Sequence, residues 1–325
     1  MKVVFMGTPE FAAVSLRKIY EHHEVAAIFT QPDKVNQRGK KIKFSPVKEF
    51  AIEKGIDLYQ PKSVKDEIII TKLKEINPDI IVVVAYGKIL PNNLIEIPKY
   101  GTINVHASIL PKYRGAAPIH AAIINGEKET GVTIMYIAEE LDAGDMVLVK
   151  RTAITEDDTL ESVHDRLAVL GADAAVEAMT AIFDGNNKRI KQNHLEATFV
   201  KPIKKEECII DWNGSSEEIF NKVRGMNPFP VAFTVLNGKI VKVYEVKKNN
   251  SEYEEFAAGT VVAIEKEFGA VIKCGKGSVI LTKVKPENKN IINGKDFVNG
   301  NYIKTGDKLG LQEEWLIYER RKNIP

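Results

Sequence analysis

The first half of the chain alternates short apolar runs with longer segments in which apolar residues recur every three or four positions. The short runs predict β-strands, and the longer segments predict helices. The predicted strands are Lys2–Met6, Glu24–Thr30, Asp79–Ala85, Thr102–Val105, Val132–Ala138 and Met146–Thr152. The predicted helices are Phe11–Tyr20, Val47–Lys54, Val64–Ile76, Ala117–Asn125 and a long helix that begins after Thr159. This alternation is typical of an α/β fold with a doubly wound, mostly parallel, Rossmann-like sheet.

The pattern changes after about residue 185. Residues 188–207 are irregular and rich in lysine and arginine, and we interpret them as a basic linker. Beyond the linker, a helix at Ser216–Arg224 precedes five strand-like runs separated by glycine and asparagine turns. The runs are Val231–Leu236, Lys239–Val246, Gly259–Ile264, Ala270–Cys274 and Val279–Val284. Five such strands fit a small antiparallel β-barrel of the OB kind, so we expect a first domain over residues 1–187 and a second over residues 208–325.

Length and composition narrow the class of protein. The chain has 325 residues, of which 44% are apolar, and this is more than a single hydrophobic core usually holds. Its net charge is only +2, so a surface for nucleic acid has to be a local patch. The two cysteines, Cys208 and Cys274, exclude a disulfide scaffold and a zinc site built from several cysteines. The apolar run Ile80–Ala85 is too short to span a bilayer, and no signal peptide is evident, so we expect a cytoplasmic protein without a membrane segment.

The stretch Asn104–Pro118 contains the most informative polar residues, Asn104, His106, Ser108 and Arg114, at the end of a predicted strand. Ligands of open α/β sheets bind beyond the carboxyl ends of the strands. The Asn104 amide can donate to a developing oxyanion, and His106 can donate a hydrogen bond or shuttle a proton near neutral pH. The alternative is that both side chains only satisfy backbone groups of the loop.

Asp142 lies in the turn Glu139–Met146 between two predicted strands. A carboxylate in this turn could orient an imidazole and accept a proton from an attacking amine. The alternative is that Asp142 and Asp145 are turn formers beside a glycine. Sequence spacing does not place Asp142 near His106. The histidines are scattered and no metal-ligating constellation is evident, so we expect a site without a metal.

The loop Gln37–Lys43 is strongly basic, because Arg38, Lys40, Lys41 and Lys43 surround Gly39. Clusters of this kind bind the phosphates of nucleic-acid backbones, and a glycine lets such a loop adapt on contact. The alternative is that these are the ordinary charges of a solvated loop. From this loop alone, the two interpretations are about equally favoured.

In their order along the chain, four motifs resemble those of the folate-dependent formyltransferases. They are Asn104-Val105-His106, Ser108–Pro111, Tyr113–Pro118 and Leu141–Asp145. The resemblance implies formyl transfer from 10-formyltetrahydrofolate to an amine without a metal, and it implies a catalytic trio of Asn104, His106 and Asp142. It also implies two folate-binding segments, which contain Ser108, Ile109, Leu110 and Pro111 in one and Val84, Tyr86 and Gly87 in the other.

Further segments resemble the branch of this family that formylates methionine carried by an initiator tRNA. They are MGTPEFA at the start, residues 29–48, VVVAYGKILP at 82–91, GVTIM at 131–135 and R-x-x-NPFP at 224–230. The resemblance implies a methionyl-initiator tRNA partner, contacted by Arg38, Lys40, Lys41, Lys43, Lys204 and Lys205. We expect a monomer. Three alternatives stay open: a formyltransferase for a small amine, a nicotinamide-dependent reductase and a non-catalytic RNA-binding protein.

Overall fold

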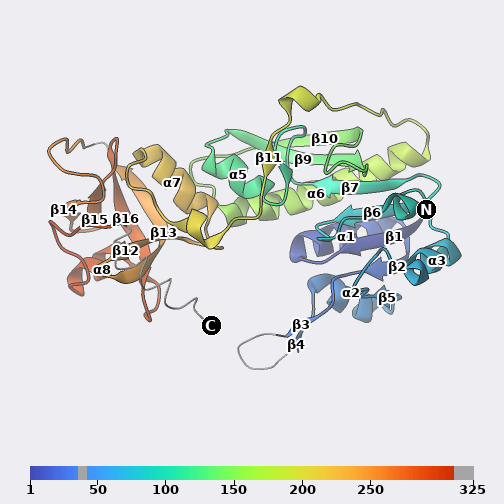
Figure 1. Cartoon of the computed structure of the whole chain (residues 1–325), viewed down its shortest axis with the longest axis horizontal. Helices are drawn as coiled ribbons and strands as arrows, with labels where there is room; N and C mark the ends of the chain where they lie inside the picture. The colour runs from blue at the N-terminus through green and yellow to red at the C-terminus, as the bar shows by residue number, and fades with distance from the viewer. Residues whose placement is uncertain (36–41, 250, 311–325) are drawn as a thin grey trace. The chain divides into compact units, whose positions relative to one another are not determined.

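A computed structural model describes residues 1–35, 42–249 and 251–310 of the chain (Figure 1). These residues form two compact units. The first contains Met1–Pro118, Glu129–Ala153 and Val163–Lys201, and the second contains Ile119–Lys128, Ile154–Ser162 and the chain from Pro202 onward. The segment predicted as a linker, 188–207, is therefore divided between the units, because its residues up to 201 pack with the first.

The first unit is built on a seven-stranded sheet in the order β10-β9-β7-β6-β1-β2-β5. Five neighbouring strands are parallel: β7 (Thr102–His106), β6 (Ile80–Val84), β1 (Lys2–Gly7), β2 (Glu24–Phe29) and β5 (Leu58–Tyr59). At the other end of the sheet, β9 (Glu129–Tyr136) pairs antiparallel with β7, and β10 (Met146–Ala153) pairs antiparallel with β9. The predicted doubly wound, mostly parallel sheet is confirmed. The central strands β1 and β6 are apolar and almost fully buried, as expected for strands covered on both faces.

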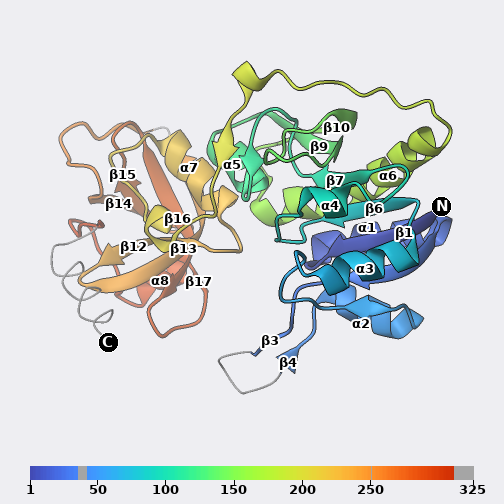
Figure 2. The same ribbon diagram turned by 45° about the vertical axis from the view of Figure 1, so that its right-hand side comes forward.

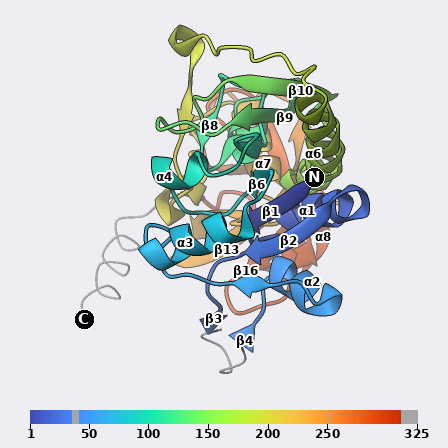
Figure 3. The same ribbon diagram turned by 90° about the vertical axis from the view of Figure 1, so that its right-hand side faces the viewer.

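Helices cover both faces of this sheet, as Figure 3 shows end-on. One face is covered by α1 (Glu10–His22) and α6 (Leu160–Phe183), and α2 (Pro46–Lys54) packs on α1. The other is covered by α3 (Glu67–Ile76) and the short α4 (Asn92–Ile95), which share a core with Val4, Met6, Ile81 and Val83. Helix α2 begins one residue before its predicted start, because Ser45 accepts a hydrogen bond from the Lys48 amide and Pro46 opens the first turn.

Two short strands, β3 (Lys34–Val35) and β4 (Ile42–Lys43), pair antiparallel where the sequence predicts only a loop. They extend away from the large sheet in all three ribbon views (Figures 1–3). Residues 36–41, which join them, lie outside the described residues. The basic residues Arg38, Lys40 and Lys41 fall in that segment, whereas Lys43 lies on β4 and is exposed.

The second unit contains an antiparallel sheet in the order β12-β13-β16-β15-β14, with β17 beside β16 (Figure 2). The strands are β12 (Ala232–Leu236), β13 (Lys239–Asn249), β14 (Val261–Glu265), β15 (Gly269–Lys273), β16 (Ser278–Pro286) and β17 (Ile292–Asn293). The first five match the predicted strands. The short β17 and helix α8 (Gly294–Asn299) are additional elements that the pattern did not predict.

Residues 306–310 close this sheet by bonding to both of its edges. Gly310 donates its backbone N–H to the oxygen of Val235 on β12, at 3.1 Å. On the other edge the Leu309 amide donates to Gly259 and the Val261 amide donates to Asp307, each at 2.8 Å. Contact of one segment with both edge strands is the kind of closure expected for the small barrel that the sequence predicts.

Helix α7 (Ser216–Gly225) packs on β13 and contacts two earlier segments of the chain, 119–128 and 154–162. The buried Arg224 side chain donates from Nη1 to the backbone oxygens of Thr155 and Asp158, at 2.6 and 3.2 Å. Helix α5 (Pro118–Ile124) packs near the end of α7, where a Cβ on Gly225 would lie 2.8 Å from Ile124 Cγ1. These contacts explain why residues 119–128 and 154–162 belong to the second unit.

Candidate active site

His106 lies at the carboxyl end of β7 and is almost completely buried. Its Nε2 is 2.9 Å from the backbone oxygen of Tyr113. A carbonyl can only accept, so Nε2 must carry the hydrogen and donate it. The other ring nitrogen, Nδ1, is then available for proton transfer, and it lies 3.7 Å from Asp142 Oδ2. The structure therefore brings together two predicted residues whose proximity sequence spacing could not establish.

Asp142 lies in the connection between β9 and β10, and its backbone has a φ of +50°. One carboxylate oxygen, Oδ2, accepts a hydrogen bond of 2.8 Å from the Gly115 amide. The same oxygen faces His106 at a distance too long for a hydrogen bond but suited to an ion pair when the imidazole is protonated. The carboxylate is thus fixed on one side by a backbone amide while it faces the imidazole on the other.

Asn104 precedes His106 by two residues on β7. Successive side chains of a strand alternate between its faces, so Asn104 and His106 lie on the same face of the sheet. Val105 faces the other side and packs near Gly171 of α6. The Asn104 side chain is only half-buried, which leaves an amide beside the imidazole at the sheet edge where ligands of this fold bind.

The predicted folate loop 108–111 is held by internal hydrogen bonds. The Ser108 hydroxyl donates to the Lys112 oxygen at 2.6 Å. Thr133 of β9 accepts from the Leu110 amide at 3.1 Å and donates to the Ser108 oxygen at 2.7 Å. Ser108 and Leu110 are buried, whereas Ile109 and Pro111 are half-exposed. Ser108 and Leu110 therefore support the loop from inside, and Ile109 and Pro111 are the members whose side chains a ligand can reach.

Directly after β6, the large side chain of Tyr86 points inward while its neighbours Ala85 and Gly87 are exposed. Tyr86 is 1% exposed and belongs to the core under α3 and α4, where burial raises the pKa of its phenol to about 12. Val84 is fully buried at the end of β6. Ala85 and Gly87 are exposed and have positive φ angles of 45° and 77°. Gln31 donates to the Tyr86 oxygen at 2.9 Å and fixes this turn.

Two buried polar residues connect to the Asp142 loop, and sequence reasoning missed one of them entirely. Arg114, one of the polar residues singled out in the stretch after β7, is fully buried and donates to Gln192 and Glu140. Gln192 in turn donates to the backbone of the Asp142 loop. It falls in the stretch interpreted as a linker, and no periodicity or motif marks a single glutamine there. Only the tertiary contacts identify it.

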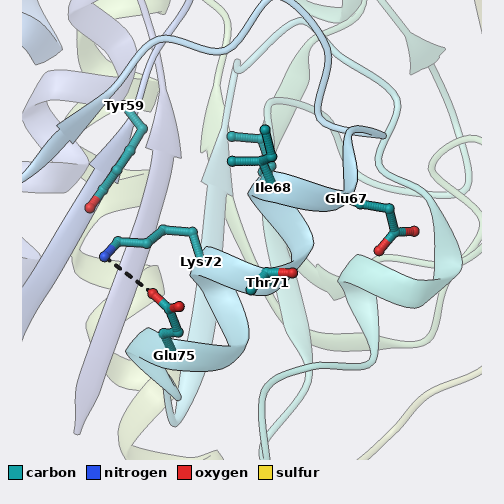
Figure 4. A pocket seen from close by; sticks show the side chains of 7 residues that line it. Tyr59, Glu67, Ile68, Thr71, Lys72 and Glu75 are labelled. Carbon is teal, nitrogen blue, oxygen red and sulfur yellow. Dashed lines mark hydrogen bonds and ion pairs between the residues drawn. The ribbon is translucent and has the colours of Figure 1, made fainter.

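A pocket of about 400 Å³ lies on α3 and β5 (Figure 4). It is lined by Tyr59, Glu67, Ile68, Ile69, Thr71, Lys72 and Glu75, and it contains an ion pair of 3.4 Å between Lys72 and Glu75. None of the predicted site residues lines it. The pocket is therefore separate from the His106–Asp142 pair at the carboxyl end of β7.

The described residues contain no group of histidine, cysteine and carboxylate side chains arranged to hold a metal ion. Within the same part of the chain, no helix combines the length and hydrophobicity needed to cross a membrane. Lys43, Lys204 and Lys205 are exposed, the first in the first unit and the other two in the second.

The chain is similar in sequence to known proteins along almost its whole length. Residues 1–179 match the family described as formyl transferase, and residues 202–302 match the formyl transferase C-terminal domain. The methionyl-tRNA formyltransferase of Fusobacterium nucleatum is 52% identical over 95% of this chain and 100% of its own length. The methionyl-tRNA formyltransferase of Bacillus subtilis is 43% identical over 96% of this chain and 99% of its own length.

Solved structures share the fold at lower identity. WlaRD, a sugar 3N-formyl transferase, has a TM-score of 0.64 and 21% identity, with 89% of this chain and 99% of that one covered. HypX from Aquifex aeolicus in complex with tetrahydrofolic acid has a TM-score of 0.60 and 18% identity, with 96% of this chain covered. This chain spans about half of HypX, 51% of its length. The sequence similarity is much the stronger finding, and it shows that the chain belongs to the formyl transferase family, in its methionyl-tRNA formyltransferase branch.

Proposed function

We propose that Asn104, His106 and Asp142 carry out formyl transfer from 10-formyltetrahydrofolate to the α-amino group of methionine on initiator methionyl-tRNA. Family membership supports this reaction and its two substrates. The observation that carries the assignment of residues is the His106–Asp142 pair, with Nδ1 and Oδ2 3.7 Å apart at the carboxyl edge of the sheet.

The reaction creates charge at two atoms, and the three residues match those atoms chemically. The amine attacks the formyl carbon, so negative charge develops on the formyl oxygen and positive charge on the amine. The Asn104 amide and a protonated Nδ1 of His106 can donate hydrogen bonds to that oxygen. Removing one such donor typically costs about 2.7–4 kcal/mol of transition-state stabilisation. Asp142 can accept the amine proton and return it to the departing folate nitrogen.

The residues around this site fit a folate. Ala85 and Gly87 expose backbone donors and acceptors, which suit the edge of a pterin ring. Ile109 and Pro111 offer half-exposed apolar side chains from the loop after β7. In this proposal Val84, Tyr86, Ser108 and Leu110 act through the backbone they hold, because their side chains are buried.

The test is formyl transfer from 10-formyltetrahydrofolate to methionine-charged initiator tRNA, with uncharged tRNA as the control substrate. His106→Ala should lower kcat by about a hundredfold or more, the usual effect of losing an oxyanion donor. His164→Ala is a matched control, because His164 also pairs with a carboxylate, Asp165 at 2.9 Å, but lies on α6. Full activity of His106→Ala would refute the assignment. Folate binding without transfer to the tRNA would redirect the search to small amines.

We propose that Arg38, Lys40, Lys41 and Lys43, together with Lys204 and Lys205, contact the tRNA backbone. Neutralising phosphates releases counterions, so the KM for tRNA should rise steeply with salt while the KM for the folate changes little. Arg38→Ala should impair transfer to tRNA far more than hydrolysis of the folate alone. An equal loss in both reactions would contradict a docking role for this loop.

The remaining expectations concern organisation. We propose that the chain acts in the cytoplasm as a monomer, with a catalytic domain over residues 1–187 and a tRNA-binding domain over 208–325. The basic segment 188–207 joins them, and its residues up to 201 pack with the first unit. Light scattering coupled to size-exclusion chromatography tests the oligomeric state, since a monomer has a mass of 36.3 kDa. A concentration-dependent mass near twice that value would contradict it.

A further inference from the structure

Residues 190–200, here called the strap, hold both loops of the proposed catalytic site. Figures 1 and 2 follow this segment from the end of α6 to β11 (Phe199–Val200). At its start, Ile190 and Met146 exchange two backbone hydrogen bonds of 2.8 and 2.9 Å. At its end, β11 pairs with β8 (Arg114–Gly115), directly after Tyr113, whose oxygen accepts from His106. One continuous segment thus contacts the loop behind His106 and the loop that carries Asp142.

In the middle of the strap, the Gln192 side chain uses its full hydrogen-bonding capacity. Gln192 is 5% exposed. Its Nε2 donates to the backbone oxygens of Asp142 at 2.9 Å and Gly144 at 2.8 Å. Its Oε1 accepts from the Nε and Nη2 atoms of Arg114 at 3.2 and 2.8 Å. The amide has one possible orientation, because a guanidinium only donates and a carbonyl only accepts.

The Asp142 backbone needs an external restraint of this kind. Its φ of +50° lies in the left-handed region, which aspartate enters more readily than most residues but still at a cost. Gln192 bonds to the carbonyl of Asp142 itself and to the carbonyl two residues later. These two bonds span the peptide units that follow Asp142 and so set the direction in which its side chain leaves the backbone.

From these contacts we propose that Gln192 is a positioning residue for formyl transfer: it holds Asp142 so that Oδ2 meets the Gly115 amide and faces His106. Gln192 acts through Asp142 and its backbone. The buried Arg114 fixes the orientation of the amide and supports it from behind. This inference rests on the proposed catalytic role of Asp142, and its test includes a measurement that does not depend on activity.

Gln192→Glu is the sharpest test. The substitution keeps the size of the side chain and keeps a partner for Arg114, but it places an oxygen against the two carbonyl oxygens of the Asp142 loop. Asn187→Asp is the matched control. Its Nδ2 donates to the Tyr136 hydroxyl at 3.2 Å, and a hydroxyl can reverse its role and donate to a carboxylate.

Displacement of a catalytic group by about 1 Å can cost about a hundredfold in rate, so Gln192→Glu should lower kcat by about tenfold to a hundredfold. The KM values for folate and tRNA should stay within about twofold. The same substitution on an Asp142→Asn background should cost less than about twofold, because both changes act through one carboxylate. A similar fold-loss on both backgrounds, or no loss in either, would overturn the proposal.

The direct readout is the Gly115 amide proton in a protein labelled with ¹⁵N-glycine. While it donates to the Asp142 carboxylate, its NMR signal should lie downfield, and in Gln192→Glu it should move upfield, with no such change in Asn187→Asp. An unchanged Gly115 signal in Gln192→Glu would overturn the positioning role even if activity fell. Full activity of Asp142→Asn would instead refute the proposed catalytic role of Asp142, while the Gly115 signal still decides whether Gln192 positions this carboxylate.

Discussion

The close approach of the strap to Gly115 makes a strong prediction for Gly115→Ala. A Cβ built on Gly115 would lie 2.3 Å from the backbone oxygen of Val200, and the residue has a φ of +106°. Carbon and oxygen in contact are normally about 3.3 Å apart, so the strap would have to move by about 1 Å. That movement breaks the pairing of β8 with β11, in which the Arg114 amide donates at 2.8 Å and the Ala116 amide at 2.9 Å.

The magnitude follows from these contacts. Each lost backbone hydrogen bond costs about 0.5–1.5 kcal/mol of folding free energy, and a side chain at positive φ adds about 1–2 kcal/mol. Together they give a loss of about 3 kcal/mol. For a unit of this size, 1 kcal/mol lowers Tm by about 2–4 °C, so the expected fall is about 6–12 °C. The Gly115 amide also donates to Asp142, so kcat should fall by about tenfold or more.

The assay is differential scanning calorimetry together with formyl transfer to charged initiator tRNA. Gly185→Ala is the control, because Gly185 has a φ of +69° but no atom lies within 4 Å of the position that a Cβ would take there. It introduces a positive-φ side chain without a collision, so only the cost of the backbone conformation, about 1–2 kcal/mol, applies. Tm should fall by about 2–8 °C and activity should be unchanged. Gly115→Ala with unchanged activity, or with the same small fall in Tm as the control, would refute the reasoning.

Three further predictions concern the second unit. Arg224→Met should lower the free energy of unfolding of the second unit by about 3 kcal/mol, because two backbone carbonyls lose a buried donor. Urea denaturation measures this change, and an unchanged urea midpoint would contradict it. Hydrogen bonds from Ser215 hold the pKa of Glu218 below its usual value, so the stabilisation by the ionised carboxylate is present above the unfolded-state pKa and is lost as pH falls through the folded-state pKa. The Tm of Glu218→Gln should therefore fall less than that of the wild type between about pH 6 and pH 3. Burial raises the pKa of Cys274 to about 12 and also raises the pKa of Cys208. Neither thiol should therefore react with iodoacetamide at about pH 8 until the protein is unfolded. Rapid labelling of the native protein would be inconsistent with this burial.

Elements with a long apolar pattern were predictable, and elements held by few contacts were not. The strand at residues 80–84 follows from an apolar run, and helix α2 begins within one residue of the start predicted from its pattern. By contrast, β17 and the closing segment 306–310 are too short to show a repeating pattern of apolar and polar residues. The division of residues 188–207 between the units also depends on contacts, since β11 pairs with a strand about 85 residues earlier.

The site shows the same limit at the level of single residues. The motifs pointed to His106 and Asp142, but only the folded chain brings them within 3.7 Å. No sequence motif marks Gln192, because its role depends on the hydrogen-bond partners of its Oε1 and Nε2 atoms in the folded chain. For Tyr86 and Leu110, a motif identifies the segment but does not distinguish a side chain that meets a ligand from one that supports the backbone. Burial makes that distinction.

The way residues 306–310 close the second unit also orders events during synthesis on the ribosome. The strap is complete once residue 201 has emerged, so the first unit can then assemble its catalytic loops. The second unit still lacks its closing segment, which follows about a hundred residues later. At about 5–20 residues per second the nascent chain exposes the open edges of β12 and β14 for no longer than about 5–20 s. Synthesis that stalls within this interval leaves those edges free to pair with other chains.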